Sequence, residues 1–498
     1  MVFSSLIFLY VFLPLSLLAY FLCRSMRGKN ISLLIFSLLF YSWGEPKFVL
    51  LLILMSAADW FFALKIDQCK VKEDPAGMKA FLACACAVNI GLIGYFKYSK
   101  LLCSLFGSTP EFILRIALPL GISFYTFQLL TYVIDVYRGD AKAEKKFWHV
   151  LLYAALFHQC IAGPIVRYNS IADELFVQRS RQNEIPEGIL RFSSGLFKKV
   201  VIANGCGAIA ESFLLSDAMI ENAGSFAANM AELGSQTVLG LWLGVVCYTL
   251  QIYFDFSAYS DMAIGMGKAI GLHYPENFNY PYISASVTDF WRRWHMSLST
   301  FFRDYVYIPL GGNRKGKART ILNLFIVWAL TGLWHGASMN FILWGLYFFV
   351  FLMIEKLFLR RSSDSPRKKG LRILPNVFSR VYLLLVVMIG WVLFRYTDMR
   401  YIPVVLKGLA GLNGNALTDF ETSIRFSGNV FFLAFSILCC TPLFRSLYDL
   451  SRRYETQHKA AAVFNSVFIY TVIPVLLLII STAELVGATF NPFLYFRF

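Results

Sequence analysis

Residues 321–353 read ILNLFIVWALTGLWHGASMNFILWGLYFFVFLM, two apolar runs joined by a short polar turn just after His335. Basic residues flank the pair, so we expect the chain to enter the membrane after Arg319 and to leave it before Arg360. A histidine at membrane depth is costly to bury and is functional by default. Histidine also titrates near neutral pH and can act as a general base. The stretch therefore predicts a membrane protein that performs chemistry in its embedded part.

The composition of the whole chain agrees with this prediction. Of 498 residues, 57% are hydrophobic and only 15% are charged, which excludes an ordinary soluble globular protein. Stretches close to the ~20 residues of a transmembrane helix occur at 2–22, 46–64, 236–254, 339–355, 376–394 and 463–482. Weaker candidates occur at 31–43, 79–96, 113–135, 147–163, 189–215, 321–336 and 430–444. We expect one all-α polytopic domain over 1–498, with roughly ten to thirteen embedded helices, some of them re-entrant.

The net charge of +16 does not indicate a nucleic-acid-binding protein, because of where the basic residues lie. They fall in short loops between apolar stretches, as expected for loops on the cytoplasmic side. The clusters are Arg24/Arg27/Lys29, Lys65/Lys70/Lys72, Arg138/Lys142/Lys145/Lys146, Arg314/Lys315/Lys317/Arg319, Arg360/Arg361/Arg367/Lys368/Lys369 and Arg452/Arg453/Lys459. Anionic lipid headgroups are their expected partners, and an anionic cosubstrate is the alternative for the cluster at 314–319.

This topology places His335 near the outer side of the membrane. Residues 320–335 would rise about 24 Å as a helix, less than the ~30 Å of the hydrocarbon core, so His335 is expected at a helix end. Gly332 and Gly336 would allow a close approach or a break there. The loop 396–429 and the tail 484–498 are expected outside the cytoplasm, and the loop is the sizeable candidate for docking a partner.

Residues 255–320 differ in kind from the rest of the chain. Polar side chains are interleaved with aromatic ones, a mixture too polar to face lipid and too apolar for a loop. Such residues should pair with one another and face a water-filled cavity. Pro281, Pro309 and the Gly311–Gly312 pair should break the stretch into short helices. We expect it to form the wall of a central funnel, with a catalytic core over 250–345 that also includes His295 and His335.

Several motifs in this part of the chain are similar to those of a known family. The runs YFDFSAYSDMAIG at 253–265, FWRRWH at 290–295, YIPLGGN at 307–313 and LWHG at 333–336 resemble the membrane-bound O-acyltransferase family. The closest branch looks like the bacterial alginate O-acetyltransferase type, which also includes cellulose and peptidoglycan O-acetyltransferases; the teichoic acid D-alanyl transfer protein is related. The run AGPIVRY at 162–168 fits the same branch, whereas His158 stands where a proline is expected.

The resemblance implies a helical scaffold around a central tunnel and transfer of an acyl group from a cytoplasmic thioester to a hydroxyl. It matches His335 to the family's near-invariant histidine and His295 to a second histidine on the opposed wall. The ending FLYFRF at 493–498 resembles a Phe-x-Tyr-x-x-Phe motif of envelope acylation systems, in which the tyrosine, here Tyr495, is thought to carry the acyl group. An extracytoplasmic, SGNH-hydrolase-like acetyltransferase partner, polysaccharide-export machinery and a bacterial inner-membrane location are implied as well.

The expected mechanism is a relay. Acetyl-CoA or another acyl thioester, a polyanion, would dock near Arg314 and Lys315 as donor substrate, and no permanently bound cofactor is expected. His335 would take the proton from the attacking hydroxyl of Tyr495, because a phenol with a pKa near ~10 is a poor nucleophile without a base. His295 would hold the thioester carbonyl or position the donor. Further substrate-binding candidates are Asn279, Arg292, Arg293, Trp294 and Arg303.

Other interpretations remain open at this point. Arg292, Arg293 and Arg303 could form ordinary ion pairs with Asp289 and Asp304, and Tyr495 could be an interfacial anchor. The polar embedded residues would also suit a transporter or flippase of an envelope precursor, although no internal repeat supports two related halves. A non-catalytic membrane anchor is a third possibility. No cysteine or carboxylate lies at metal-ligand spacing from either histidine, so no metal site is expected.

Overall fold

The chain folds into helices throughout the part that is described. The computed structural model describes all residues except 108, 161–162, 180–183, 360–372, 456–458 and 488–498, and its described part contains helices and no strands. Eight described helices are long and apolar enough to cross a membrane: Val49–Val71, Pro75–Leu105, Ile185–Ile220, Val238–Ala269, Met339–Leu357, Val377–Arg395, Phe420–Cys439 and Ala462–Gly487. The prediction of an all-α polytopic membrane protein is confirmed.

The helices form three consecutive groups along the chain. The first contains α1 (Leu13–Leu22), α2 (Met26–Gly44), α3 (Val49–Val71), α4 (Pro75–Ile93), α5 (Ser99–Leu105), α6 (Glu111–Leu114), α7 (Ile122–Arg138), α8 (Phe147–Ala155) and α9 (Tyr168–Phe176). The second contains α10 (Ile185–Phe197), α11 (Asn204–Leu214), α12 (Asp217–Glu221), α13 (Phe226–Ser235) and α14 (Val238–Ala269). The third contains α15 (Val287–Arg293), α16 (Met296–Phe302), α17 (Gly316–His335), α18 (Met339–Ile354), α19 (Ile373–Arg395), α20 (Tyr401–Leu409), α21 (Phe420–Cys439), α22 (Leu443–Glu455), α23 (Lys459–Val467) and α24 (Ile473–Gly487).

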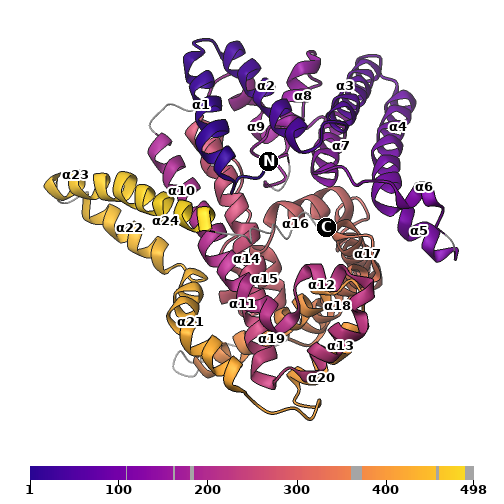
Figure 1. The fold of residues 1–498 in the computed structure, drawn as a ribbon. Helices are drawn as coiled ribbons and strands as arrows, with labels where there is room; N and C mark the ends of the chain where they lie inside the picture. The colour runs from indigo at the N-terminus through magenta and orange to yellow at the C-terminus, as the bar shows by residue number, and fades with distance from the viewer. Residues whose placement is uncertain (108, 161–162, 180–183, 360–372, 456–458, 488–498) are drawn as a thin grey trace.

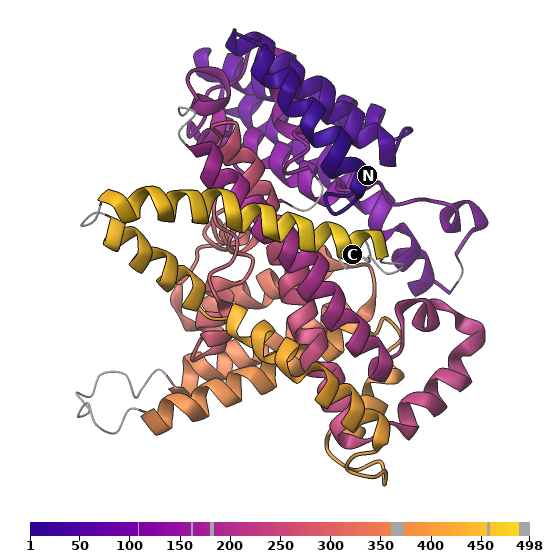
Figure 2. The same ribbon diagram turned by 60° about the vertical axis from the view of Figure 1, so that its left-hand side comes forward.

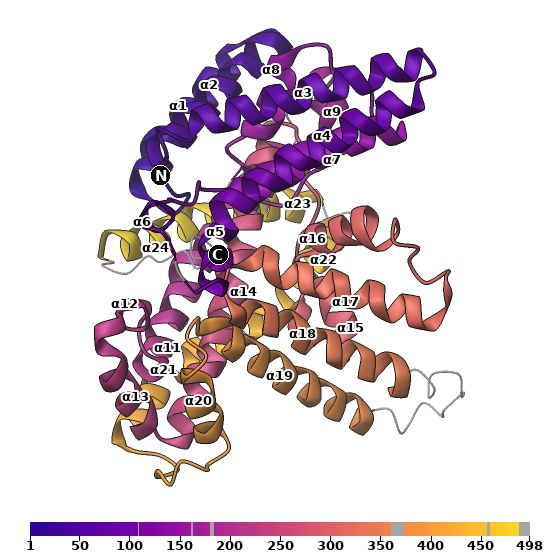
Figure 3. The same ribbon diagram turned by 90° about the vertical axis from the view of Figure 1, so that its right-hand side faces the viewer.

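Helix α14 is the central element of the fold. It contacts α10 and α11 along its length and also touches α19, α20 and α21. The first group packs together at one end of the molecule (Figure 1), and α24 crosses between that group and the rest, against α10 (Figure 2). Helices α17, α18 and α19 lie side by side (Figure 3). The long central helix therefore connects the outer bundles to one another.

The first part of the polar stretch belongs to a long helix that begins before it. Residues 255–269 continue α14 as one buried helix of 32 residues. Their carboxylates are paired with the neighbouring helix instead of facing an open cavity: Lys199 Nζ lies 2.5 Å from Asp255 Oδ1, and Lys198 Nζ lies 2.7 Å from Asp261 Oδ2. Internal pairs allow an apolar surrounding to hold such charges. The short helices begin at Pro281, the first of the predicted breaks.

The segment 396–429, which was expected to be an outer loop, contains helical structure and hydrogen bonds to the second group of helices. It contains α20, and the side chain of Asn415 donates a hydrogen bond of 2.9 Å to the carbonyl of Gln236. Leu239 N–H donates a 2.9 Å hydrogen bond to Leu417 O, at the start of α14. These contacts tie the loop to the second group of helices.

Helices α10 and α14 cross at glycines, a common way for membrane helices to approach closely. A Cβ atom placed on Gly265 would lie 2.6 Å from the backbone nitrogen of Phe192 and 2.7 Å from the carbonyl oxygen of Gly188. A Cβ on Gly195 would lie 2.8 Å from the carbonyl oxygen of Ala258. The two backbones are thus in contact with no space for side chains between them.

We expect Gly265→Leu to destabilise the protein, because backbone atoms opposite this residue cannot move aside as a flexible side chain could. Overpacking costs about 1–3 kcal/mol or more. Gly91→Leu is the matched control, since a Cβ there meets nothing within 4 Å. The measurement is the thermal midpoint of the detergent-solubilised protein, followed by size-exclusion chromatography. Equal midpoints for the two variants would show that the crossing is not close-packed.

Candidate active site

His335 is the last residue of α17, as the sequence predicted. Its side chain is buried, and its ring lies 4.9 Å from the ring of Trp334, 4.9 Å from Trp344 and 5.2 Å from Phe394, between centroids. Gly332, three residues before His335, allows α17 to pack closely on α18. A Cβ atom on Gly332 would collide with the carbonyl of Phe341 on α18. Close packing of α17 on α18 thus fixes the end of the helix that carries the imidazole.

His295 lies between the two short helices α15 and α16. Its backbone is in the left-handed region, with φ 45° and ψ 55°, which is costly for a residue that has a Cβ atom. Residues held in this way often occur at functional sites. The side chain is only 2% exposed, and its Nδ1 lies 3.1 Å from Asn277 Oδ1.

The rings of both histidines lie close to the ring of one tryptophan, Trp334. The ring centroid of Trp334 lies 5.7 Å from that of His295 and 4.9 Å from that of His335. Among the described residues, neither His335 Nδ1 nor His295 Nε2 has a hydrogen-bond partner, although both atoms are buried. A buried polar atom without a partner is costly and calls for an explanation. Contact with a substrate is one such explanation, and it makes these two nitrogens candidates for the chemistry.

The hydrogen bonds of Asn277 determine which nitrogen of His295 carries the proton. Asn277 Oδ1 lies 3.2 Å from the backbone nitrogen of Ser297, which can only donate, so the atom facing it must be the amide oxygen. That oxygen also accepts from Ser297 Oγ at 2.9 Å. His295 Nδ1 must therefore donate its hydrogen to the same oxygen, and in the neutral ring Nε2 keeps a free electron pair.

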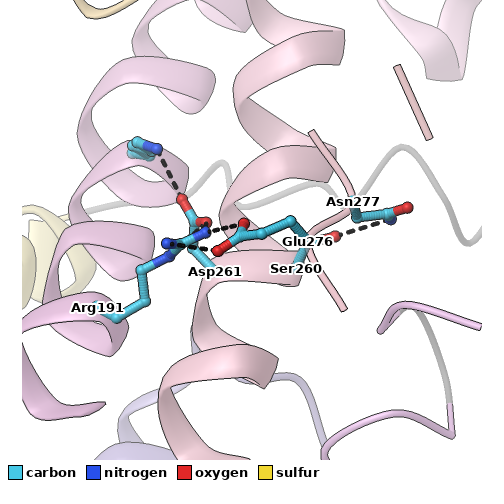
Figure 4. Close-up of polar contacts among 6 residues, drawn as sticks. Arg191, Ser260, Asp261, Glu276 and Asn277 are labelled. Carbon is cyan, nitrogen blue, oxygen red and sulfur yellow. Dashed lines mark hydrogen bonds and ion pairs between the residues drawn. The ribbon is translucent and has the colours of Figure 1, made fainter. Parts of the chain in front are cut away.

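The loop that carries Asn277 is held by an ion-pair cluster (Figure 4). Arg191 on α10 binds Glu276 through two hydrogen bonds of 2.6 and 3.1 Å, and its Nε donates to Asp261 Oδ1 at 2.8 Å. Asn277 Nδ2 donates to Ser260 Oγ at 3.1 Å. Two consecutive loop residues are thus attached to α14, one through a charged cluster and one through a buried hydroxyl. These contacts hold Asn277, the hydrogen-bond partner of His295, in place.

The other residues predicted to bind substrate are dispersed. Trp294 is 3% exposed, and its ring lies 4.9 Å from that of Trp391. Arg293 Nε lies 3.1 Å from the Asp289 carboxylate, as the ion-pair interpretation proposed. Four further candidates are exposed, namely Asn279, Arg292, Arg314 and Lys315. Tyr495 lies outside the described residues.

Arg303 is also engaged in an ion pair. Its Nε lies 2.6 Å from Asp304 Oδ1, and Arg167 reaches the other oxygen of this carboxylate. Burial alone would raise the pKa of Asp304, but the hydrogen bonds from Arg303 and Arg167 outweigh burial and hold that pKa below its ordinary value. Asp304 therefore stays ionised at neutral pH, and the guanidinium of Arg303 has a charged partner within the protein.

Two residues of the site were not singled out from the sequence. Asn277 is the partner of His295, whereas Asn279, two positions later, was expected to bind substrate and is exposed. Lys97 is buried, and its Nζ lies 3.3 Å from the carbonyl oxygen of His335. The available signal for Lys97 was a cation at the end of the apolar stretch 79–96, since charged residues at membrane depth are functional by default.

We expect Asn277→Leu to lower the stability of the protein, because the buried donors of His295 and Ser297 would lose their shared acceptor. Leaving a buried donor unsatisfied costs about 1–3 kcal/mol. Asn279→Leu is the matched control, as that side chain is exposed. Thermal midpoints in the same detergent measure the difference. An unchanged midpoint for Asn277→Leu would mean that water or another group replaces the amide oxygen.

The chain is similar to several curated proteins over most of its length. It is 35% identical to the probable alginate O-acetylase AlgI of Pseudomonas putida, with all of both chains covered. It is 32% identical to the peptidoglycan O-acetyltransferase of Helicobacter pylori, over 84% of this chain and 81% of the relative. It is 31% identical to the teichoic acid D-alanyltransferase of Bacillus subtilis, over 48% of this chain and 59% of the relative.

The family model for membrane-bound O-acyltransferases matches residues 146–397. This range contains α14, both histidines and the Asn277 loop. The family match and the full-length relatives confirm the resemblance seen in the motifs and replace the transporter and anchor interpretations. This chain therefore belongs to the membrane-bound O-acyltransferase family and is an O-acyltransferase.

Proposed function

We propose that the enzyme moves an acetyl group from cytoplasmic acetyl-CoA across the bacterial inner membrane, for O-acetylation of an envelope polysaccharide such as alginate. The observation that carries the proposal is the pair of buried imidazoles that both lie near the ring of Trp334, each with a ring nitrogen that lacks a partner among the described residues. The names of the relatives support a polymer of the cell envelope as the final acceptor.

In the first step, His335 acts as general base. It takes the proton of the attacking hydroxyl while the oxygen forms a bond to the thioester carbonyl carbon. The carbon–sulfur bond then breaks, and the imidazolium of His335 returns the proton to the departing thiolate. The products are an oxygen ester and free coenzyme A, so the histidine is regenerated in each cycle.

Tyr495 is the proposed first acceptor of the acetyl group. An ester of a phenol is a more reactive acyl donor than an ester of an alcohol, because the phenolate is the better leaving group. The acetyl group would then pass to an extracytoplasmic, SGNH-hydrolase-like acetyltransferase that works with polysaccharide-export machinery. The segment 396–429, which contains α20, is the region we propose for docking this partner.

The tautomer of His295 favours one of its two expected roles. With Nδ1–H bound to Asn277, neutral His295 presents an electron pair at Nε2 and cannot donate a hydrogen bond to the thioester carbonyl from that atom. It is suited to accept a hydrogen bond from an N–H or O–H group of a substrate. We therefore propose that His295 positions the donor or the attacking hydroxyl and does not polarise the carbonyl.

We propose that the exposed basic residues of the turn before α17 bind the acetyl-CoA donor. Arg314 and Lys315 are exposed at the opposite end of α17 from His335. Their positive charges would attract the phosphates of coenzyme A, and Arg292 is exposed as well. Arg293 and Arg303 already bind carboxylates, which makes them weaker candidates for the donor.

We expect His335→Ala to lower acetyl transfer by about 10²–10⁴-fold, the usual contribution of a general base. The assay uses purified protein in lipid vesicles, with isotopically labelled acetyl-CoA and detection of released thiol. His273→Ala is the matched control, because that histidine is half-exposed and both of its ring nitrogens are bound by Glu174 and Glu184. A fully active His335→Ala protein with a normal melting midpoint would exclude the relay.

We expect Tyr495→Phe to abolish the labelled acyl-protein intermediate, because this change removes only the hydroxyl group that would carry the label. Tyr95→Phe is the control, because this tyrosine is half-exposed and lies 400 positions away in the sequence. The intermediate is detected by rapid quenching followed by mass spectrometry of the C-terminal peptide. Retained polymer acetylation by Tyr495→Phe would favour direct delivery to a hydroxyl of the partner.

A further inference from the structure

The C-terminal end of α17, which carries His335, has an unusual set of hydrogen-bond partners. The last four carbonyl groups of an α-helix have no partner within the helix itself and need one elsewhere. Here they belong to Gly332, Leu333, Trp334 and His335. Lipid offers no hydrogen-bond donor at membrane depth, so donors from other parts of the protein are important for such a helix end.

Each of these four carbonyls has a described donor. Gly336 N–H closes the last turn on Gly332 O, at 3.4 Å. The hydroxyl of Tyr98 donates to Leu333 O at 2.6 Å. The ammonium of Lys97 donates to Trp334 O and also lies 3.3 Å from His335 O. Two adjacent residues of Gly94–Tyr98, the segment that continues α4, thus satisfy three carbonyls of a helix more than 200 positions later in the chain.

Lys97 is placed where a lysine would ordinarily be excluded. It is 7% exposed and lies within the membrane-spanning helix Pro75–Leu105. Its described acceptors are the carbonyl oxygens at the end of α17, where the helix dipole concentrates negative charge. The ammonium also lies 5.9 Å from the centroid of the Trp334 ring. The buried cation and the helix end therefore stabilise each other.

A local irregularity of the helix directs both side chains towards α17. Residues Gly94–Tyr98 form a π-helical turn, which is wider than an α-helical turn. Such turns are frequent at functional sites. Lys97 and Tyr98 are neighbours within this wider turn, and they bind consecutive carbonyls at the end of α17. The irregularity is thus part of the contact with His335.

We propose that Lys97 and Tyr98 are positioning residues for His335: they hold the last turn of α17 so that its imidazole stays at the reacting groups. This inference rests on the proposed role of His335 as general base. Without these donors the end of α17 would have to turn its carbonyls elsewhere, and the histidine would move with it. A displacement of about 1 Å can cost 10²-fold in rate.

The test compares Lys97→Met, Lys97→Arg and Tyr98→Phe in the vesicle assay. We expect Lys97→Met to lower kcat about 10–100-fold with less than about a threefold change in KM for the donor, because donor binding is left intact. Lys97→Arg keeps a cation with donors and should recover part of the rate. Tyr98→Phe removes one hydrogen bond and should cost about 3–10-fold. Lys100→Met and Tyr95→Phe are the matched controls, since both residues are exposed on the same helix.

A double variant distinguishes a positioning role of Lys97 from a general loss of structure. In the His335→Ala protein, Lys97→Met should leave the remaining rate unchanged, because its effect acts through the imidazole. If Lys97→Met unfolds the protein, the same comparison is made with Tyr98→Phe, which removes only a hydroxyl. The inference is overturned if both variants keep the wild-type kcat, or if the His335→Ala rate falls further by the same factor. An active His335→Ala protein would instead overturn the proposed base, so the two failures can be told apart.

Discussion

A polar group inside a membrane protein must find its partner within the chain, because lipid offers neither donor nor acceptor. This constraint explains the central part of the molecule. Asp255 and Asp261 on α14 are bound by lysines that follow α10, and the carbonyls at the end of α17 are bound by residues of the first helical group. The polar contacts connect segments that are far apart in sequence. The Asp261 cluster holds the loop of Asn277, the partner of His295, and Lys97 holds the helix end that carries His335. Packing at glycines brings the helices close enough for these bonds to form.

Much of the fold could be predicted from the sequence because hydropathy reports directly on a membrane environment. The position of His335 at a helix end followed from helix rise and the flanking basic loops, and the helix does end there. The continuation of α14 through 255–269 was missed, because polar residues in the sequence do not reveal whether water or another helix faces them. Only the location of Lys198 and Lys199 beside α14 decides this.

The site was predicted less completely than the fold. The two histidines could be found, since ionisable residues in apolar surroundings are conspicuous. Their partners could not, because the interval from Lys97 to His335 is 238 residues and no local pattern links them. Asn277 and Asn279 are two positions apart in one loop, and only the turn of the backbone decides which one meets His295. The roles assigned to the two histidines, to the exposed basic residues and to Tyr495 all stay predictions.

The left-handed backbone at His295 has a consequence for how the site works. A conformation that costs free energy persists only where the surroundings determine it fully, and here Asn277, Ser260 and the Arg191 cluster do so. The imidazole is therefore already aimed before any substrate arrives, and little reorganisation remains for the reaction itself. For the proposed role of His295, the free energy needed to hold this conformation is therefore spent once, during folding, and not in each catalytic cycle.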